Sequence, residues 1–419
     1  MVRTPFHLQA AVKKAFPALP GLYRRFRSWR QQPRSYYSRA PKRFAALVQQ
    51  MNDVPFPRLQ QDQFHRRVEH DPADPAHISN VVIEINNTCN IDCLMCLTSL
   101  STRTKGRMTP EMMELAAAKT TEFGAREVEL HTIGDPLANP RLADVFALLR
   151  RHRVRTGLTT NGLLLHRHVE MLIEFVDVCS SISFSIDGGT APTYERIRAG
   201  GNWDQLIANL DLARERLAPK GFRIRSSMVV SSENVHEAGL YIERLRDYVT
   251  DPALDIVFTF LNSLAPDNAY FNAANLFPIH TSTTAPCRQI SAPVPHMFID
   301  GRVTVCSRDY DGSLVVGDIR RHSLAEVLHG EPMHAIQRAH AAGDVSAYPL
   351  CSTCFMVDSR IADAFNELTS YLLYFFPHEK AAFYQDRVDE CIAMFQRGAD
   401  PAIAVSLFRQ THASRHSVN

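Results

Sequence analysis

No stretch of the 419-residue sequence is apolar for long enough to cross a membrane as a helix, which takes about 18 residues or more. The N-terminal region also lacks the apolar core of a secretory signal. These absences predict a cytoplasmic protein without a transmembrane segment. The composition is otherwise typical of a globular chain, with 45% hydrophobic and 21% charged residues. Its length favours a main domain with additions.

Acidic residues are missing from the start of the chain. Residues 1–50 contain eleven Lys and Arg but no Asp or Glu, and aromatic residues are interleaved with this charge. Such an arm could contact an anionic membrane surface, a nucleic acid or an acidic partner. It also resembles an organellar transit peptide, or it is a helical extension with solvated cations. We expect residues 1–78 to form a basic, mainly helical N-terminal extension.

Cysteine is present in a number that does not suit a full set of disulfides. The nine cysteines are Cys89, Cys93, Cys96, Cys179, Cys287, Cys306, Cys351, Cys354 and Cys391. In a reducing compartment, clustered cysteines are more often metal ligands or catalytic groups than disulfides. Cys179 and Cys391 lie apart from the clusters in apolar or helical surroundings, so we interpret them as structural.

Strand and helix patterns alternate from residue 79 onward. Strands are expected at residues 81–86, 127–133, 155–160, 180–187, 223–231 and 255–261, and helices at 110–123, 141–150, 168–175, 203–217 and 235–248. Thr109, followed by Pro110, is typical of a helix N-cap. Six strands alternating with helices predict a parallel sheet with right-handed crossovers. The expected fold is α/β, a partial (β/α)6 TIM-like barrel over residues 79–265.

Polar residues recur at every second position on several of these strands. They are Glu129 and His131, then Thr159, then Ser183, Ser185 and Asp187, and finally Arg225 and Ser227. Parallel strands that are covered on both faces are usually apolar throughout. The repeated pattern therefore indicates a barrel that encloses a polar ligand.

The segment after the first expected strand places three thiols at C-x3-C-x2-C: Cys89, Cys93 and Cys96. Three ligands at this spacing can hold three corners of a [4Fe–4S] cluster, which normally takes four cysteines. One iron is then left open for another ligand. Structural zinc is the main alternative, but it requires four ligands, and no fourth cysteine lies nearby in the sequence.

Further motifs follow in a fixed order. Gly134-Asp135-Pro136-Leu137 ends the second expected strand, Thr160-Asn161-Gly162 the third, and Ser185-Ile186-Asp187-Gly188 the fourth. With the cysteine motif, they resemble the radical S-adenosylmethionine (radical SAM) superfamily over about residues 80–265. Asp135 stands where that family usually has Glu, and Met95 replaces a common aromatic residue.

The resemblance implies a [4Fe–4S] cluster on the three cysteines, with S-adenosylmethionine on its open iron. It implies cofactor contacts from Met95, Gly134, Asp135, Pro136, Asn161, Ser185, Asp187 and Arg225. A single electron from a reducing partner, such as flavodoxin or ferredoxin, cleaves the cofactor. The resulting 5′-deoxyadenosyl radical abstracts hydrogen from the substrate.

A second set of cysteines comprises Cys287, Cys306, Cys351 and Cys354. Four thiols can ligate one [4Fe–4S] cluster or one zinc ion fully. The spacing resembles the auxiliary-cluster region called SPASM, and in particular its shortened twitch form, which implies one auxiliary cluster that transfers electrons. We expect this loop-rich domain at residues 280–357 and a helical tail at 358–419.

The resemblance implies an oxidoreductase or a rearrangement enzyme. We expect a small polar substrate such as a sugar, an aminocyclitol or a cell-envelope precursor. Modification of a peptide or protein is the alternative, and a non-enzymatic iron–sulfur or zinc protein is a third. His131, on the polar face of the second strand, is the candidate catalytic base; an interior histidine with only a structural role is the competing interpretation.

Overall fold

The computed structural model describes residues 80–261, 269–277, 287–354 and 359–399. The basic arm expected at residues 1–78 and the tail from residue 400 lie outside the described ranges. The predictions made for these two segments therefore stay predictions. Within the described ranges, no helix combines the length and the apolar character that a membrane crossing requires.

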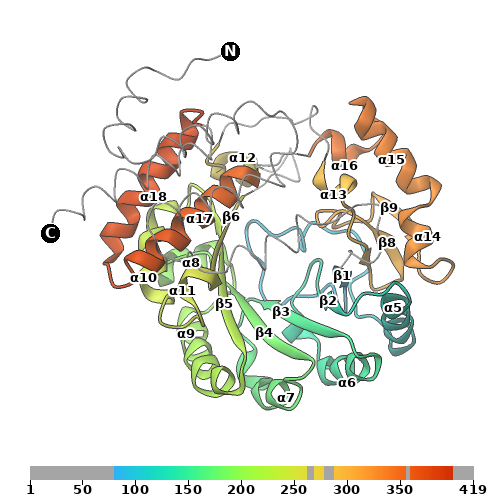
Figure 1. Ribbon diagram of the computed structural model, residues 1–419, viewed down its shortest axis with the longest axis horizontal. Helices are drawn as coiled ribbons and strands as arrows, with labels where there is room; N and C mark the ends of the chain where they lie inside the picture. Colours follow the sequence, from blue (N-terminus) through green and yellow to red (C-terminus); the bar gives the residue numbers. More distant parts are fainter. Residues whose placement is uncertain (1–79, 262–268, 278–286, 355–358, 400–419) are drawn as a thin grey trace, which may run out of the picture. The chain divides into compact units, whose positions relative to one another are not determined.

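Six parallel strands form the first part of the sheet (Figure 1). They are β1 (Asn80–Ile83), β2 (Glu127–Glu129), β3 (Arg155–Thr160), β4 (Cys179–Ser185), β5 (Arg223–Val230) and β6 (Ile256–Phe260). Strands that follow one another in the chain also pair with one another, always in parallel. The predicted α/β partial barrel is therefore confirmed. β1 and β2 end earlier than expected, and the candidate site residues follow their ends.

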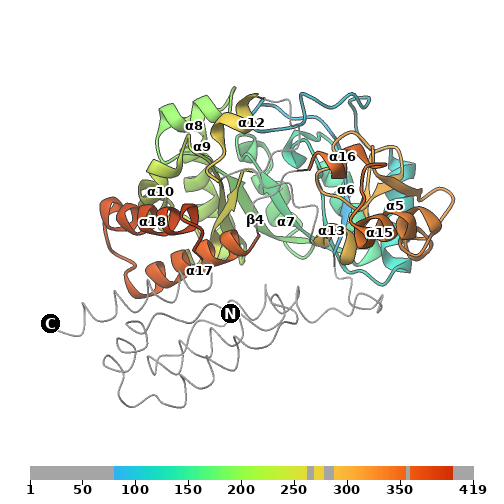
Figure 2. The ribbon, with the colours of Figure 1, turned by 90° about the horizontal axis from the view of Figure 1, so that it is seen from above.

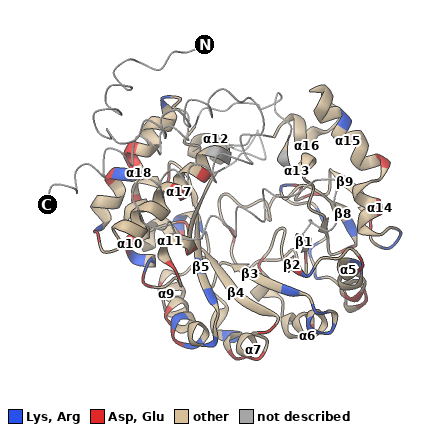
Figure 3. Cartoon of the chain, viewed as in Figure 1, with Lys and Arg blue, Asp and Glu red and all other residues tan. Residues whose placement is uncertain are grey.

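Helices connect these strands and lie outside the sheet (Figures 1 and 2). They are α5 (Pro110–Glu122), α6 (Leu142–His152), α7 (Val169–Glu174), α8 (Ala191–Ile197), α9 (Trp203–Leu212), α10 (Ala238–Leu245) and α11 (Pro252–Asp255). The Thr109 side chain caps α5 by accepting a hydrogen bond from the backbone N–H of Met112. The helix expected at 203–217 is helical throughout, as α9 continued by a π-helical turn (Ala213–Leu217). Many charged residues lie on these outer helices (Figure 3).

The two faces of the strands differ in polarity. Along β5, Ile224, Met228 and the residues in phase with them are buried, whereas Arg225 and Ser227 are half-buried. The strand pairing aligns Thr159 with Ser183 and Ser183 with Arg225. Since the helices cover the apolar face, these polar side chains form the inner wall of the partial barrel. The polar lining expected from the sequence is present.

Three further strands extend the same sheet beyond β1. β7 (His296–Met297) runs parallel to β1, and β8 (Arg302–Thr304) and β9 (Val315–Asp318) continue the sheet in antiparallel pairing. Short helices accompany them: α13 (Arg288–Ser291), α14 (Leu324–Leu328), α15 (Glu331–Ala342) and α16 (Pro349–Ser352). The sequence predicted a loop-rich region here without strands, because elements of two to four residues show no periodicity. The segment that carries the second cysteine set therefore belongs to the same sheet as the strands of the partial barrel.

Helices flank the opposite end of the sheet, beside β6: α12 (Ala269–Ala274), α17 (Ser359–Phe375) and α18 (Ala381–Gln396). The Asn366 side chain on α17 exchanges hydrogen bonds of 2.7 Å with both the N–H and the carbonyl of Phe258 in β6. It therefore occupies backbone groups that an edge strand would otherwise leave unpaired. The helical character expected after residue 358 holds for the described part of this tail.

Candidate functional site

The three thiols of the cysteine triad (Cys89, Cys93 and Cys96) lie in the loop that follows β1. Each sulfur accepts a hydrogen bond from a nitrogen: Asn161 Nδ2 to Cys89 at 3.6 Å, Arg198 Nη1 to Cys93 at 3.8 Å, and Thr98 N to Cys96 at 3.4 Å. Donors aimed at sulfur stabilise a thiolate and tune a metal bound to it. Hydrogen-bond donors from three segments of the chain are therefore directed at the three sulfur atoms.

Two of the triad thiols, those of Cys93 and Cys89, are costly to ionise. Burial raises the pKa of Cys93 to about 12, the charge of Arg198 opposes that rise, and the neighbouring triad cysteines add to it. Burial likewise raises the pKa of Cys89. Thiolates are soft ligands that favour iron–sulfur clusters, zinc or copper(I), and binding releases their protons. Within the described ranges, no three His, Cys, Asp or Glu side chains form a ready site for a single metal ion.

The loop is held against the end of β2 by a close backbone contact. Gly134 has φ +87°, and a Cβ there would stand 2.7 Å from the carbonyl oxygen of Thr88, directly before Cys89. Asp135 N donates to the same carbonyl at 3.0 Å. Asn86 adds side-chain bonds to the carbonyls of Thr88 and Asp135. Only glycine fits at position 134, because the left-handed conformation and the contact both exclude a side chain.

The carboxylate of Asp135 is directed into the protein. It accepts hydrogen bonds from Thr160 Oγ1 at 2.9 Å, Asn161 N at 2.7 Å and Leu137 N at 2.9 Å, and it is 3% exposed. Burial raises its pKa, and these three donors oppose that rise. Asp135 therefore joins the ends of β2 and β3 and orients Asn161 toward the triad. Pro136, which begins a short 3-10 turn, is buried beside it.

Asp187 forms a buried ion pair behind the triad. It lies just beyond β4, is fully buried, and pairs with Arg198, its Oδ2 lying 2.6 Å from Arg198 Nη2. Because Arg198 also donates to Cys93, the pair places a guanidinium against a triad sulfur. The sequence assigned no role to Arg198, since its contact with the triad depends on chain folding over about a hundred residues.

The remaining sequence-predicted contacts lie around this centre. Met95 packs against the apolar cluster of Leu97, Leu261, Phe271 and Ala274. Ser185 is half-buried at the end of β4. Arg225 lies on the inner wall of β5, where its Nε is 3.4 Å from Asp255 Oδ1. Asn161, Ser185 and Asp187 thus lie at or just after the carboxyl ends of neighbouring strands, where sites of parallel sheets are expected. Arg225 instead lies in the first half of β5.

Two histidines lie together on the inner wall. His131 follows β2, and His296 is in β7, where it pairs with Val82, itself the partner of Glu129. Both Nδ1 atoms are buried without a hydrogen-bond partner among the residues that the structure describes. Burial, reinforced by the proximity of His131, lowers the pKa of His296 to about 4. His296 was missed from the sequence because β7 is only two residues long.

Acid should therefore destabilise the protein through His296. Its pKa is lowered from 6.5 to about 4 on folding, so the unfolded chain binds this proton first and stability falls as pH drops below 6.5. Between about pH 7 and about pH 5.5 we expect a loss of about 1 kcal/mol that His296→Asn does not show. Urea unfolding at both pH values measures it, with the exposed His166 mutated to Asn as control. Identical pH dependence of wild type and His296→Asn would contradict the assignment.

The second cysteine set also converges. Cys287 precedes α13, Cys306 follows β8, and Cys351 and Cys354 lie in and after α16. Burial raises the pKa of Cys306 to about 12, and the nearby thiols of Cys354 and Cys287 add to the rise. Burial raises the pKa of Cys351 to about 11, with the same two neighbours contributing. These four thiols match in number the ligands that a [4Fe–4S] cluster or a zinc ion takes, although as placed they do not form a ready site for a single metal ion.

The other two cysteines have structural surroundings. Cys179 begins β4 and is fully buried, and Cys391 lies in α18 at 3% exposure. Burial raises the pKa of both thiols, that of Cys179 to about 12. The structural interpretation of these two residues agrees with their positions away from both sets.

Two family models match this chain, one over the segment that carries the triad and the other over most of the segment that carries the second cysteine set. A model of the Radical SAM superfamily matches residues 83–243, and a model of an iron–sulfur cluster-binding domain, SPASM, matches residues 291–355. These segments contain the triad and three of the four cysteines of the second set. The residues available fit the clusters that the two domains carry: three thiols with sulfur-directed donors, and four converging thiols.

Individual relatives match only part of the chain. The probable GTP 3′,8-cyclase of Methanocaldococcus jannaschii is 25% identical over 173 residues, 41% of this chain and 56% of that protein. The mycofactocin maturase MftC of Mycobacterium ulcerans is 26% identical over 153 residues, 36% of this chain and 40% of that protein. The alignments thus span about half, or less, of these curated relatives. The crystal structure of BtrN with AdoMet and 2-DOIA is 17% identical, with a TM-score of 0.44, and the match covers 66% of this chain and 92% of that one.

Proposed function

The chain belongs to the radical SAM superfamily and carries a SPASM iron–sulfur domain, and from this premise we propose that it abstracts hydrogen from a small polar substrate. When bound, the triad cluster and S-adenosylmethionine supply a 5′-deoxyadenosyl radical for that step. Cys89, Cys93 and Cys96 would hold three irons of the cluster. The protein's part is to place the reactants and to exclude side reactions.

The residues around the triad divide into two groups by what they touch. Asn161, Arg198 and Thr98 donate to the triad sulfurs and would stabilise the bound cluster. Asp135 acts as a positioning residue, because its carboxylate is already bonded to Thr160 and Asn161. Gly134, Pro136, Met95, Ser185, Asp187 and Arg225 stay proposed contributors to the S-adenosylmethionine site.

The polar inner wall is the observation that favours a small polar substrate. Thr159, Ser183 and Arg225 are aligned across three strands, and Ser185 pairs with Ser227 in the adjacent row. Serine and threonine hydroxyls suit the hydroxyl and amino groups of a sugar or an aminocyclitol, and the Arg225 guanidinium can donate to its hydroxyl oxygens. We propose His131, which is half-buried on the inner wall, as the base that accepts a proton from a substrate hydroxyl.

The second cysteine set holds the auxiliary cluster in this proposal. Four protein thiolates leave no iron open, so this cluster suits electron transfer rather than substrate binding. It would accept the electron that remains on the substrate once one hydrogen atom and one proton have left. A cytoplasmic flavodoxin or ferredoxin would supply the electron that begins each turnover.

Replacing one of the four thiols tests this assignment. Cys306→Ala is expected to lower bound iron from about eight to about four atoms per chain, while deoxyadenosine formation with a chemical reductant persists. Cys391→Ala, which alters a buried thiol outside both sets, serves as the control. Zinc in the wild-type protein, with iron near four and unchanged by the substitution, would overturn the auxiliary cluster and leave the triad intact.

Peptide modification is the second candidate, because a relative matched over part of the chain is called a maturase. Deuterated sugars and aminocyclitols, then peptides, can be screened for transfer of deuterium into deoxyadenosine by mass spectrometry. Label from a polyol supports the first candidate. Label from peptides alone would replace it, and a non-enzymatic iron–sulfur or zinc protein would form no deoxyadenosine with any substrate.

A further inference from the structure

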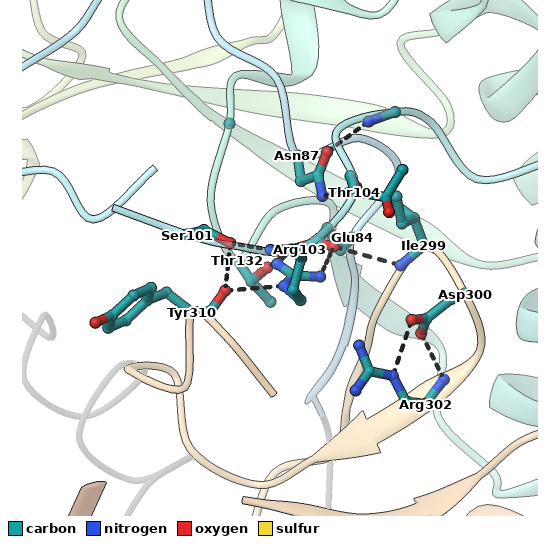
Figure 4. A network of polar contacts seen from close by, with 12 residues as sticks. Glu84, Asn87, Ser101, Arg103, Thr104, Thr132, Ile299, Asp300, Arg302 and Tyr310 are labelled. Atoms are coloured by element: carbon teal, nitrogen blue, oxygen red, sulfur yellow. Dashed lines mark hydrogen bonds and ion pairs between the residues drawn. The ribbon is translucent and has the colours of Figure 1, made fainter. Parts of the chain in front are cut away.

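A buried ion pair joins the triad loop to the SPASM domain (Figure 4). Glu84 lies just beyond the end of β1 and is fully buried, and Arg103 is in the loop after the triad with 6% side-chain exposure. Both guanidinium Nη atoms lie 2.7 Å from Glu84 oxygens, one each. Such a paired geometry fixes both the position and the orientation of the two groups.

Each partner of this pair also binds a second segment. Glu84 accepts from Thr132 Oγ1, in the loop after β2, and from Ile299 N at 3.3 Å, after β7. Arg103 Nε donates to the carbonyl of Tyr310 at 2.8 Å. The Arg103 guanidinium also lies over the Phe298 ring, 4.1 Å from its centroid. The pair therefore connects β1 and the triad loop with two parts of the SPASM domain.

Neighbouring contacts extend this connection. Thr102 N and Oγ1 donate to the Asp311 carboxylate at 2.6 and 2.9 Å, and Ser101 Oγ donates to the carbonyl of Tyr310 at 3.0 Å. In the sequence, Arg103 follows Cys96 by seven residues, and Tyr310 follows Cys306 by four. The contacts thus lie within a short length of chain from a ligand of each proposed cluster.

The energetics indicate a role in geometry more than in stability. Removing two charges from water costs several kcal/mol per ion, and apolar replacements of a buried pair are often at least as stable. The interaction is also not needed to join the domains, since β1 and β7 already pair in one sheet. Because the pair contacts the loops of both proposed clusters, its role is better explained by the relative position of these loops, which it fixes.

We propose that Glu84 and Arg103, with Asp311, are positioning residues that fix the auxiliary-cluster loop against the triad loop. This proposal rests on the two-cluster function described above. The junction formed by these three residues keeps the two clusters at one separation, so that the electron released after hydrogen abstraction reaches the SPASM domain before side reactions occur. Its loss leaves both clusters bound and allows their separation to vary.

Arg103→Met tests the junction, with Arg141→Met as the matched control, because Arg141 forms an ion pair with Asp144 in which both side chains are exposed. We expect both variants to keep wild-type iron content. In Arg103→Met alone, the magnetic interaction between the two reduced clusters, measured by electron paramagnetic resonance, becomes weaker or broadly distributed. Hydrogen exchange of residues 97–106 should rise about tenfold or more in the same variant.

A variant on the SPASM side covers the case in which Arg103→Met fails to fold and leaves Glu84 without its cation. Asp311→Asn loosens the same contact without burying an unpaired charge, and it should show the same changes in smaller measure. Wild-type interaction and exchange in either folded variant would overturn the proposal. Wild-type protein with about four irons would instead remove the auxiliary cluster, while hydrogen exchange still decides whether the junction holds the loops together.

Discussion

Cys89→Ala is expected to abolish deoxyadenosine formation and to lower bound iron by about four atoms per chain. The reason is local: Cys89 supplies one of three thiols in a loop whose sulfurs each receive a directed hydrogen bond. With two thiols left, the cluster lacks a protein ligand at a second iron. Anaerobic reconstitution, iron analysis and mass spectrometry of deoxyadenosine measure both effects.

Cys179→Ala is the matched control for that variant, since Cys179 is a fully buried cysteine outside both sets. It should keep its iron and its deoxyadenosine formation, at some cost in stability from the cavity left in the core. Full iron content and activity in Cys89→Ala would contradict the assignment of the triad.

Gly134→Ala should impair the same site without removing any ligand. Its Cβ would stand 2.7 Å from the carbonyl oxygen of Thr88 and 2.9 Å from that of Asn86, and φ is +87°. The triad loop must then move, and a displacement of about 1 Å at a catalytic centre can cost about a hundredfold in rate. We expect a loss of deoxyadenosine formation of at least about that size, measured at saturating cofactor.

Gly124→Ala separates conformational strain from displacement of the loop. Gly124 has nearly the same φ, +88°, but a Cβ there meets nothing within 4 Å. It should lose about 1–2 kcal/mol of stability from the left-handed conformation and retain activity. Equal losses of activity in both variants would show that strain, rather than the contact with the triad loop, explains the effect of Gly134→Ala.

The barrel could be predicted from the sequence because its strands are long enough to show a pattern. β3 begins and ends where expected, and Thr109 caps α5 as its sequence predicts. β1 and β2 were predicted too long. Glu84 and His131 continue the alternation of polar and apolar residues beyond the last residue that pairs with a neighbouring strand. β7, β8 and β9 were missed because two to four residues cannot establish a period.

The ligands of the site were easier to predict than their surroundings. Cysteine spacing is local, so the triad and the second set could be found directly. Arg198, His296 and the Glu84–Arg103 pair act through contacts between distant segments, which a linear pattern does not contain. For Asp135, the cofactor contact implied by the sequence stays a prediction, and the structure adds the hydrogen bonds that its carboxylate accepts from Thr160 and Asn161.

Anaerobic reconstitution of the wild-type protein with iron and sulfide tests the central claim most directly. The reduced protein is incubated with S-adenosylmethionine, and iron, zinc and deoxyadenosine are quantified in the same sample. The account predicts about eight irons per chain together with deoxyadenosine. Bound zinc alone, with no deoxyadenosine from a well-folded sample, would contradict it.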